Sequence, residues 1–108
     1  MLSKIAIKYF DAFSRADILC LKKCFSDGVS LRDWSLDANG IESVLNEFTN
    51  IFKSLSDVNV DVVNIYEIES TVIAELIITA KEIGSIKVVD ILSFDENEKI
   101  RSIRAYKG

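Results

Sequence analysis

The chain has 108 residues, of which 49% are hydrophobic and 28% are charged, a composition typical of a globular domain with one core. Its 17 acidic residues outnumber 13 scattered basic ones, so we expect no nucleic-acid partner. Because there is no histidine, the sequence excludes Ser-His-Asp and Cys-His nucleophiles and any histidine-ligated metal. Acid–base chemistry is left to carboxylates, lysine or tyrosine.

The first predicted elements are two helices. Apolar side chains recur at helical spacing over residues 2–15, which predicts an amphipathic helix. Lysines break every apolar run in residues 1–8, so this segment predicts neither a signal peptide nor a membrane span, and we expect a cytoplasmic protein. Asp17 is placed to cap a second, shorter helix that runs to about Phe25 and ends near residues 27–28.

The side chains that could hold a cofactor are few. Cys20 and Cys24 lie four residues apart in the second helix, and they are either a redox pair or, more simply, two reduced thiols beside the core. None of the four glycines belongs to a GxxxxGKS/T or GxGxxG phosphate-binding loop. We therefore expect no cofactor and no metal.

A short strand and a third helix follow. The segment Val29–Trp34 alternates apolar and polar residues, as a strand does. Asn39, with Glu42 three residues later, fits a variant of the capping box, and apolar residues recur at helical spacing from Ile41 to Leu55. This stretch predicts a third amphipathic helix.

In the second half of the chain, apolar and polar residues alternate with the two-residue period of β-strands. Alternation and β-branched residues predict four long strands, over residues 58–68, 71–83, 86–94 and 99–107. Gly84-Ser85 suits a two-residue hairpin turn, and the polar residues 95–98 suit another turn. Residues 1–108 thus predict a single α+β domain, in which three N-terminal helices pack on one face of a curved antiparallel β-sheet.

The strand faces that point away from the presumed core are rich in apolar side chains. Six residues belong to these faces: Val63, Ile65, Ile73, Ile77, Val89 and Ile91. A sheet with one face in water carries more polar residues there, so we expect a homodimer through the outer sheet face. The alternative explanation is the ordinary preference of Val and Ile for strands.

One acidic residue stands among apolar neighbours. Asp90 lies in the run Ile86–Phe94, and alternation places it on the same face as Val88 and Leu92. That face should point to the core and carry the carboxyl group with it. Because burying an unpaired carboxylate is costly, such a group finds a partner, stays protonated or lines a pocket. We therefore predict that the pKa of Asp90 is raised and that the interior around it has a functional role.

Two further polar side chains point inward. Alternation places Asp33 with Val29 and Leu31, and Tyr9 lies on the apolar stripe of the first helix. Each has an ordinary interpretation, because a buried tyrosine finds a hydrogen-bond partner and an aspartate at a strand end forms turns. Together, Tyr9, Asp33 and Asp90 form a candidate acid–base set.

Several segments resemble those of a known family. They are residues 8–13 around Tyr9, the pair Asp17-Ile18, residues 24–27, Gly40 before the third helix, and residues 100–106. With the order of elements, they resemble the nuclear transport factor 2-like, or SnoaL-like, proteins, and most of all the ketosteroid isomerase branch. The resemblance covers most of the chain and implies a cone-shaped fold with a conical pocket.

The resemblance also implies roles for the three polar residues. Asp33 stands at the position of the general base, which moves a proton between carbons next to a carbonyl. Tyr9 and Asp90 stand at the positions that donate hydrogen bonds to the developing enolate oxygen. A carboxylic acid kept neutral by an apolar site is a known feature of ketosteroid isomerase, and here it would be Asp90.

The chain departs from that branch beside the site. Phe25 and Phe48 stand where tyrosines support the first-helix tyrosine in parts of that branch. Trp34 stands where proline is common, and we expect it to narrow or cover the pocket mouth. Seven apolar residues are expected to line the substrate pocket: Phe13, Phe25, Trp34, Phe48, Phe52, Val88 and Leu92.

Two functions compete. The first is an isomerase, cyclase or dehydratase that acts without metal on a small hydrophobic carbonyl compound. The second is a non-catalytic module of the same fold, which binds a small ligand or a protein partner as a dimer. A cavity of roughly 300 Å³ or more beside Asp90 favours the enzyme. An interior filled by Phe25, Trp34 and Phe48 favours the binding module.

Overall fold

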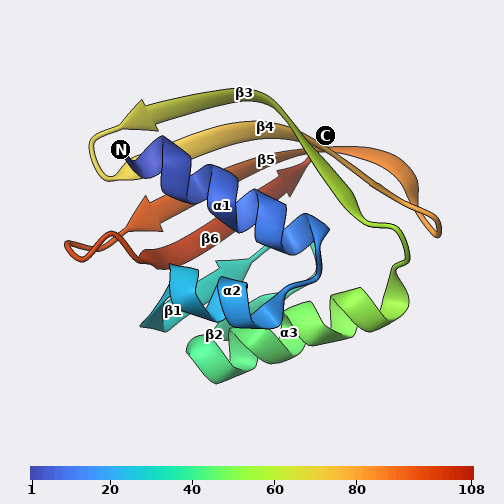
Figure 1. Ribbon diagram of the computed structural model, residues 1–108, viewed down its shortest axis with the longest axis horizontal. Helices are drawn as coiled ribbons and strands as arrows, with labels where there is room; N and C mark the ends of the chain where they lie inside the picture. The colour runs from blue at the N-terminus through green and yellow to red at the C-terminus, as the bar shows by residue number, and fades with distance from the viewer.

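A computed structural model describes residues 1–108 (Figure 1). It confirms the expected order of three helices followed by four long strands. The elements are α1 (Leu2–Ser14), α2 (Ile18–Cys24), β1 (Phe25–Arg32), β2 (Asp37–Asn39), α3 (Ile41–Ser54), β3 (Asn59–Ile68), β4 (Thr71–Ala80), β5 (Gly84–Phe94) and β6 (Ile100–Lys107). None of the helices is long and apolar enough to cross a membrane.

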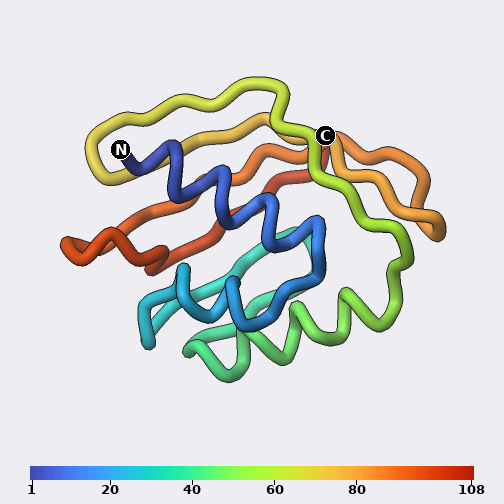
Figure 2. The backbone as a smooth tube through the Cα atoms, in the orientation of Figure 1, coloured from blue at the N-terminus to red at the C-terminus, as the bar shows by residue number.

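The six strands form one curved sheet in the order β2-β1-β6-β5-β4-β3, and the helices lie on one face of it (Figures 1 and 2). The α+β class is therefore confirmed. The sheet is mixed rather than wholly antiparallel, because β1 and β6 run parallel while all other neighbours run antiparallel. The intervening α3 and the β3–β5 meander supply the long connection that a parallel pair needs.

The second helix starts as expected and ends earlier. The Oδ1 atom of Asp17 accepts a hydrogen bond from the backbone N–H of Cys20 at 3.1 Å, which confirms the cap. The helix ends at Cys24, and Phe25 is already extended because it pairs with Ile100 of β6. Residues 26–28, expected near the helix end, therefore belong to β1.

The start of α3 differs from the prediction. Asn39 pairs with Ser30 in the short strand β2, which the sequence did not predict, so Asn39 does not cap the helix. The N-cap is Gly40, with φ +89° and no side-chain hydrogen bond. A positive φ costs glycine nothing sterically, because it has no Cβ atom.

The β4–β5 hairpin also differs from the prediction. Ala80 pairs with Gly84, so the loop contains the three residues 81–83, and Gly84-Ser85 lies inside β5. Gly84, the first residue after this loop, has φ +67°, a conformation that glycine adopts without steric cost. The predicted turn at 95–98 is confirmed, since Asp95 Oδ1 accepts the N–H groups of Asn97 and Lys99 at 2.9 and 3.0 Å.

A bulge in β3 changes which residues face the core. The pairing with β4 shifts register between Val62 and Asn64, so Val63 is an extra residue in the strand. As a result, Val62 and Ile65 both pack against the core, and the assignment of Ile65 to the outer face is wrong. Val63 is exposed, and the other expected outer residues are half-buried and outside the core: Ile73, Ile77, Val89 and Ile91.

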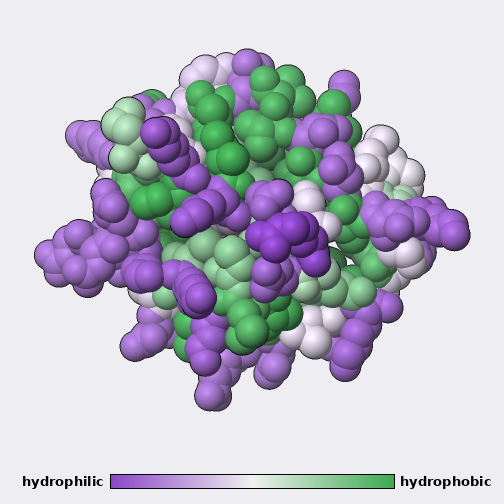
Figure 3. Space-filling view, in the orientation of Figure 1, coloured by the Kyte–Doolittle hydropathy of each residue, from purple (hydrophilic) through white to green (hydrophobic).

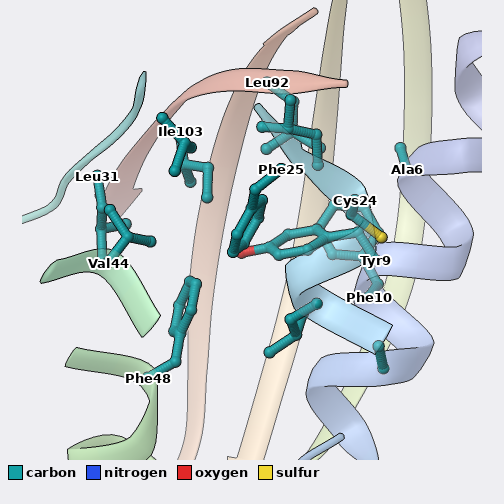
Figure 4. Packing of buried hydrophobic residues seen from close by; sticks show 14 of the residues in the cluster. Ala6, Tyr9, Phe10, Cys24, Phe25, Leu31, Val44, Phe48, Leu92 and Ile103 are labelled. Atoms are coloured by element: carbon teal, nitrogen blue, oxygen red, sulfur yellow. The ribbon is translucent and has the colours of Figure 1, made fainter. Parts of the chain in front are cut away.

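The core lies between the helices and the sheet. Twenty buried hydrophobic residues form one cluster, which includes the rings of Tyr9, Phe25 and Phe48 from α1, β1 and α3 (Figure 4). On the helix-covered side of the molecule, polar and charged residues cover much of the surface, with hydrophobic side chains between them (Figure 3). The buried layer thus supplies the walls for any interior site.

Candidate functional site

A cavity of about 540 Å³ opens between the helices and the sheet. Of the 20 residues that line it, 16 are hydrophobic. Tyr9, Asp33 and Asp90 all line this one cavity, so the fold brings together the three polar residues selected from the sequence. The volume lies within the usual range of small-molecule sites and exceeds the roughly 300 Å³ expected of an open pocket.

The sheet register explains why there is space beside Asp90. Its partner on β4 is Ala74, and its partner on β6 is Ala105. Directly opposite residues on one face of a sheet are close neighbours, so the small side chain of Ala105 leaves room that a larger side chain would fill. Ala105 itself lines the cavity.

The carboxyl group of Asp90 is buried without a protein partner. The residue is 7% exposed, and it forms neither a hydrogen bond nor an ion pair with another protein group. Burial, and to a smaller extent the negative charge of Asp33, raises the pKa of Asp90 from 3.8 to about 7. Near neutral pH, a large fraction of the molecules therefore carries a protonated Asp90, which can donate a hydrogen bond into the cavity.

The hydroxyl group of Tyr9 is a second donor. The ring is 3% exposed and points from α1 toward the rings of Phe25 and Phe48, with centroid distances of 5.9 and 6.4 Å (Figure 4). The hydroxyl forms no hydrogen bond within the protein, although it lies near Asp90. Burial, followed by the charges of Asp90 and Cys24, raises the pKa of Tyr9 well above 10, so this phenol stays protonated.

Asp33 lies just beyond the end of β1 and serves a turn. Its Oδ1 atom accepts the backbone N–H groups of Ser35 and Leu36, each at 2.7 Å. These bonds hold the half-buried carboxylate in one orientation. The Oδ2 atom forms no hydrogen bond with the protein and remains available to accept a proton.

Three of the seven apolar residues expected in the pocket line the cavity, namely Phe13, Trp34 and Phe48. The other four do not: Phe25, Phe52, Val88 and Leu92. The rings of Phe25 and Phe52 stack instead on either side of Phe48, at 5.8 and 6.4 Å between centroids. Val88 and Leu92 share the core face with Asp90 but are buried within the packed core.

Most of the remaining lining was not found from the sequence. It consists mainly of aliphatic residues of the strands and of α3: Leu31, Ile51, Val60, Leu76, Ile78, Ile86 and Ile103. Their spacing indicates an inward face but not which part of that face stays open. Lys107 was also missed; its Nζ atom lies 5.6 Å from the centre of the Trp34 ring. No group of three or more Cys, Asp and Glu side chains is arranged to hold a metal ion.

Comparison with known proteins assigns the architecture. No protein-family model and no curated protein sequence matches this chain. An NTF2-like protein of unknown function from Cytophaga hutchinsonii superposes with a TM-score of 0.85 over 100% of this chain and 90% of that chain, at 13% identity. The chain has the NTF2-like fold. This finding confirms the fold that the resemblance implies.

Two more solved structures share the NTF2-like fold. A Shewanella denitrificans protein named as a SnoaL-like polyketide cyclase matches with a TM-score of 0.88 and 14% identity, over 99% of this chain and 90% of that one. A Catenulispora acidiphila protein with a ketosteroid isomerase-like fold, in complex with trimethylamine, matches with a TM-score of 0.83 and 17% identity over 94% and 83%. At these identities the likeness concerns the fold, and function must be argued from the site.

Proposed function

We propose that this NTF2-like protein is a small acid–base enzyme, of the isomerase, cyclase or dehydratase type, which transfers a proton on a hydrophobic carbonyl compound. One observation carries the proposal: an apolar cavity of about 540 Å³ receives two buried hydrogen-bond donors, Tyr9 and neutral Asp90, that the protein itself leaves unpaired. No side-chain polar atom of the protein is both fully buried and unpaired, so these two groups remain accessible from the cavity, where a polar atom of a ligand would pair with them.

The proposed reaction gives each of the three polar residues a role. The Oδ2 atom of Asp33 takes a proton from the carbon next to the carbonyl, and negative charge develops on the carbonyl oxygen. Tyr9 and protonated Asp90 donate hydrogen bonds to that oxygen, which are strongest in a water-poor site. Asp33 then returns the proton to a carbon of the same intermediate, so no metal or cofactor takes part.

The relatives by fold are compatible with this class of reaction. The Shewanella denitrificans protein bears the name of a polyketide cyclase, one of the reaction types proposed here. Because identity to it is 14%, its name supports the reaction class and gives no substrate.

The test is proton exchange on a simple ketone. We expect the protein to accelerate deuterium incorporation beside the carbonyl of 2-tetralone in D₂O, measured by proton NMR. Tyr9→Phe removes one oxyanion donor and should slow this exchange by about 10²–10³-fold. Tyr66→Phe, which alters an exposed tyrosine on β3, is the matched control and should leave the rate unchanged. A parent protein that gives only the buffer rate would contradict the proposal.

The second candidate is a non-catalytic ligand-binding module. Two observations favour it: Oδ1 of Asp33 serves the turn at Ser35 and Leu36, and Phe25 and Phe48 offer Tyr9 no hydroxyl partner. A module of this kind would bind 2-tetralone with a measurable heat and leave its deuterium exchange at the buffer rate. Calorimetry and exchange on the same sample therefore separate the two functions.

We further propose that the outer face of the sheet pairs two copies of the chain, in keeping with the cytoplasmic homodimer expected from the sequence. Ile73, Ile77, Val89 and Ile91 lie on that face, beside the exposed ring of Tyr66. Ile73 and Ile91 are register partners, and apolar side chains that cluster on an outer face favour an interface over a solvated surface.

Charging this face tests the assembly. Ile73→Lys places a charge between its register partners Tyr66 and Ile91, and we expect it to yield monomer or insoluble protein, because an unpaired charge in an interface is costly to desolvate. Asn46→Lys, on the exposed side of α3, adds the same charge elsewhere and should leave the assembly intact. Sedimentation gives the mass of each; a parent that is monomeric at high micromolar concentration refutes the dimer.

A further inference from the structure

A second, smaller hollow adjoins the cavity, with a volume of about 290 Å³. It lies where β1 and β6 end. Four of its seven lining residues also line the large cavity: Asp33, Trp34, Ala105 and Lys107. The two spaces therefore adjoin one another along these four residues.

This hollow is basic although the chain is acidic. The net charge of the whole chain is −4, yet Arg32, Arg104 and Lys107 gather here with Asp33 as the only carboxylate. Arg104 and Lys107 have no carboxylate within 4.0 Å, and Arg32 reaches Asp37 only at 3.9 Å. The three cations are thus left with little compensation by the protein.

The sheet register makes this gathering unfavourable for folding. Arg32 and Arg104 are direct partners on the parallel strands β1 and β6. Like charges on neighbouring strands destabilise a sheet, and the packed core does not use either side chain. An anion bound between them would relieve this repulsion.

Lys107 connects the hollow to the cavity. Its ammonium group lies 5.6 Å from the centre of the Trp34 ring, a distance at which a cation is attracted to the face of the ring. Both side chains belong to the shared wall, so the cation sits where an apolar ligand body would meet a polar end.

We propose that the ligand of this protein carries an anionic group, a carboxylate or a phosphate, which binds in the basic hollow while its hydrophobic body fills the cavity. The inference deepens the proposed function and rests on it for the use of the cavity. It names the substrate class as a hydrophobic carbonyl compound with an acidic end rather than a neutral one.

Matched probes test the charge preference. Calorimetry compares 1-naphthaleneacetate with its methyl ester, which has the same apolar body. In an apolar cavity alone the ester would bind more tightly, because the anion is costly to desolvate. We expect the anion to bind about tenfold more tightly at low salt, and the preference to shrink when salt rises to about 0.3 M. Comparison with 1-naphthyl phosphate shows whether the hollow favours phosphate or carboxylate.

Substitutions of the basic residues show which of them cause the higher affinity for the anion. Arg32→Gln combined with Arg104→Gln should lower the affinity for the anion about tenfold and leave that for the ester unchanged. Each single change should act in the same direction to a smaller extent. Arg101→Gln, on β6 but outside the hollow, is the control. Equal affinity for both probes in the parent, or an equal loss with Arg101→Gln, would overturn the inference.

The inference and the proposed function fail separately. If the protein exchanges 2-tetralone but shows no preference for the anion, the inference of an anion site is overturned and the proposed enzymatic function stands. If the protein prefers the anion but does not accelerate exchange, the inference of an anion site is supported and the proposed enzymatic function is refuted. Circular dichroism and sedimentation verify that the arginine variants keep the fold and the assembly of the parent.

Discussion

Asp33→Asn should reduce the exchange of 2-tetralone by about 10²–10⁴-fold, the usual cost of losing a positioned base. The amide oxygen of asparagine can still accept the backbone N–H groups of Ser35 and Leu36, so the turn should persist. The amide cannot take up a proton, and the loss should appear in the rate while the affinity for 2-tetralone changes little. Proton NMR and calorimetry measure the two quantities.

The same variant offers a readout that needs no turnover. The charge of Asp33 contributes to the raised pKa of Asp90, so removing it should lower the pKa of Asp90. Carboxyl-carbon NMR titration of parent and variant detects this change. Asp27→Asn, an exposed position on β1, is the control for both experiments. Full activity of Asp33→Asn would exclude this residue from the reaction.

Asp90→Asn should change stability and activity in opposite directions. The pKa of Asp90 is raised from 3.8 to about 7, so the folded protein holds this proton more tightly than the unfolded chain does. Stability is therefore lost as pH rises from about 4 to about 7, and the loss is complete above that range. At about 1.4 kcal/mol per pKa unit, the penalty is on the order of 4 kcal/mol.

Unfolding experiments measure this penalty. The free energy of unfolding of Asp90→Asn, relative to the parent, should rise between pH 4.5 and pH 8, because asparagine carries no charge. Urea titrations at both pH values determine it, and Asp61→Asn, exposed on β3, should show no such trend. A flat difference for Asp90→Asn would mean that Asp90 is charged and partnered.

Activity adds a second test of Asp90. The proposed donor is the protonated acid, so exchange by the parent should fall as pH rises through about 7. Asparagine donates a weaker hydrogen bond than a carboxylic acid, and Asp90→Asn should lower the rate about 10²-fold at pH 6. It should also lose the decline above pH 7. A variant that keeps this decline would assign the ionisation to another group.

Local periodicity explains how much of the fold could be predicted. The stripe of α1 and the alternation of β4 and β5 are set by neighbours a few residues away, and these elements were predicted within a few residues of their bounds. The short strand β2, the bulge at Val63 and the extension of β1 back to Phe25 depend on partners far away in the chain. A single sequence does not contain that pairing.

The candidate site shows the same division. Periodicity assigns a side chain to a face, which was enough to direct Tyr9 and Asp90 inward. It does not state where that face is filled and where it stays open, so Phe25 and Leu92 were expected in the pocket and lie in the packed core. The opening depends on Ala105 lying opposite Asp90, and this register appears only in the folded sheet.

The parallel pair of β1 and β6 has a consequence for how the protein folds. Phe25 and Ile100 are register partners, so β1 cannot take its place in the sheet until β6 has formed. The chain between Phe25 and Ile100 forms a long loop when these strands pair. Closing this loop is entropically costly, and contacts between distant segments slow folding. Until β1 joins the sheet, the apolar inner faces of β4 and β5 are exposed and can contact other unfolded chains, which favours aggregation. The strand pair that positions Asp33 thus makes the site a late product of folding.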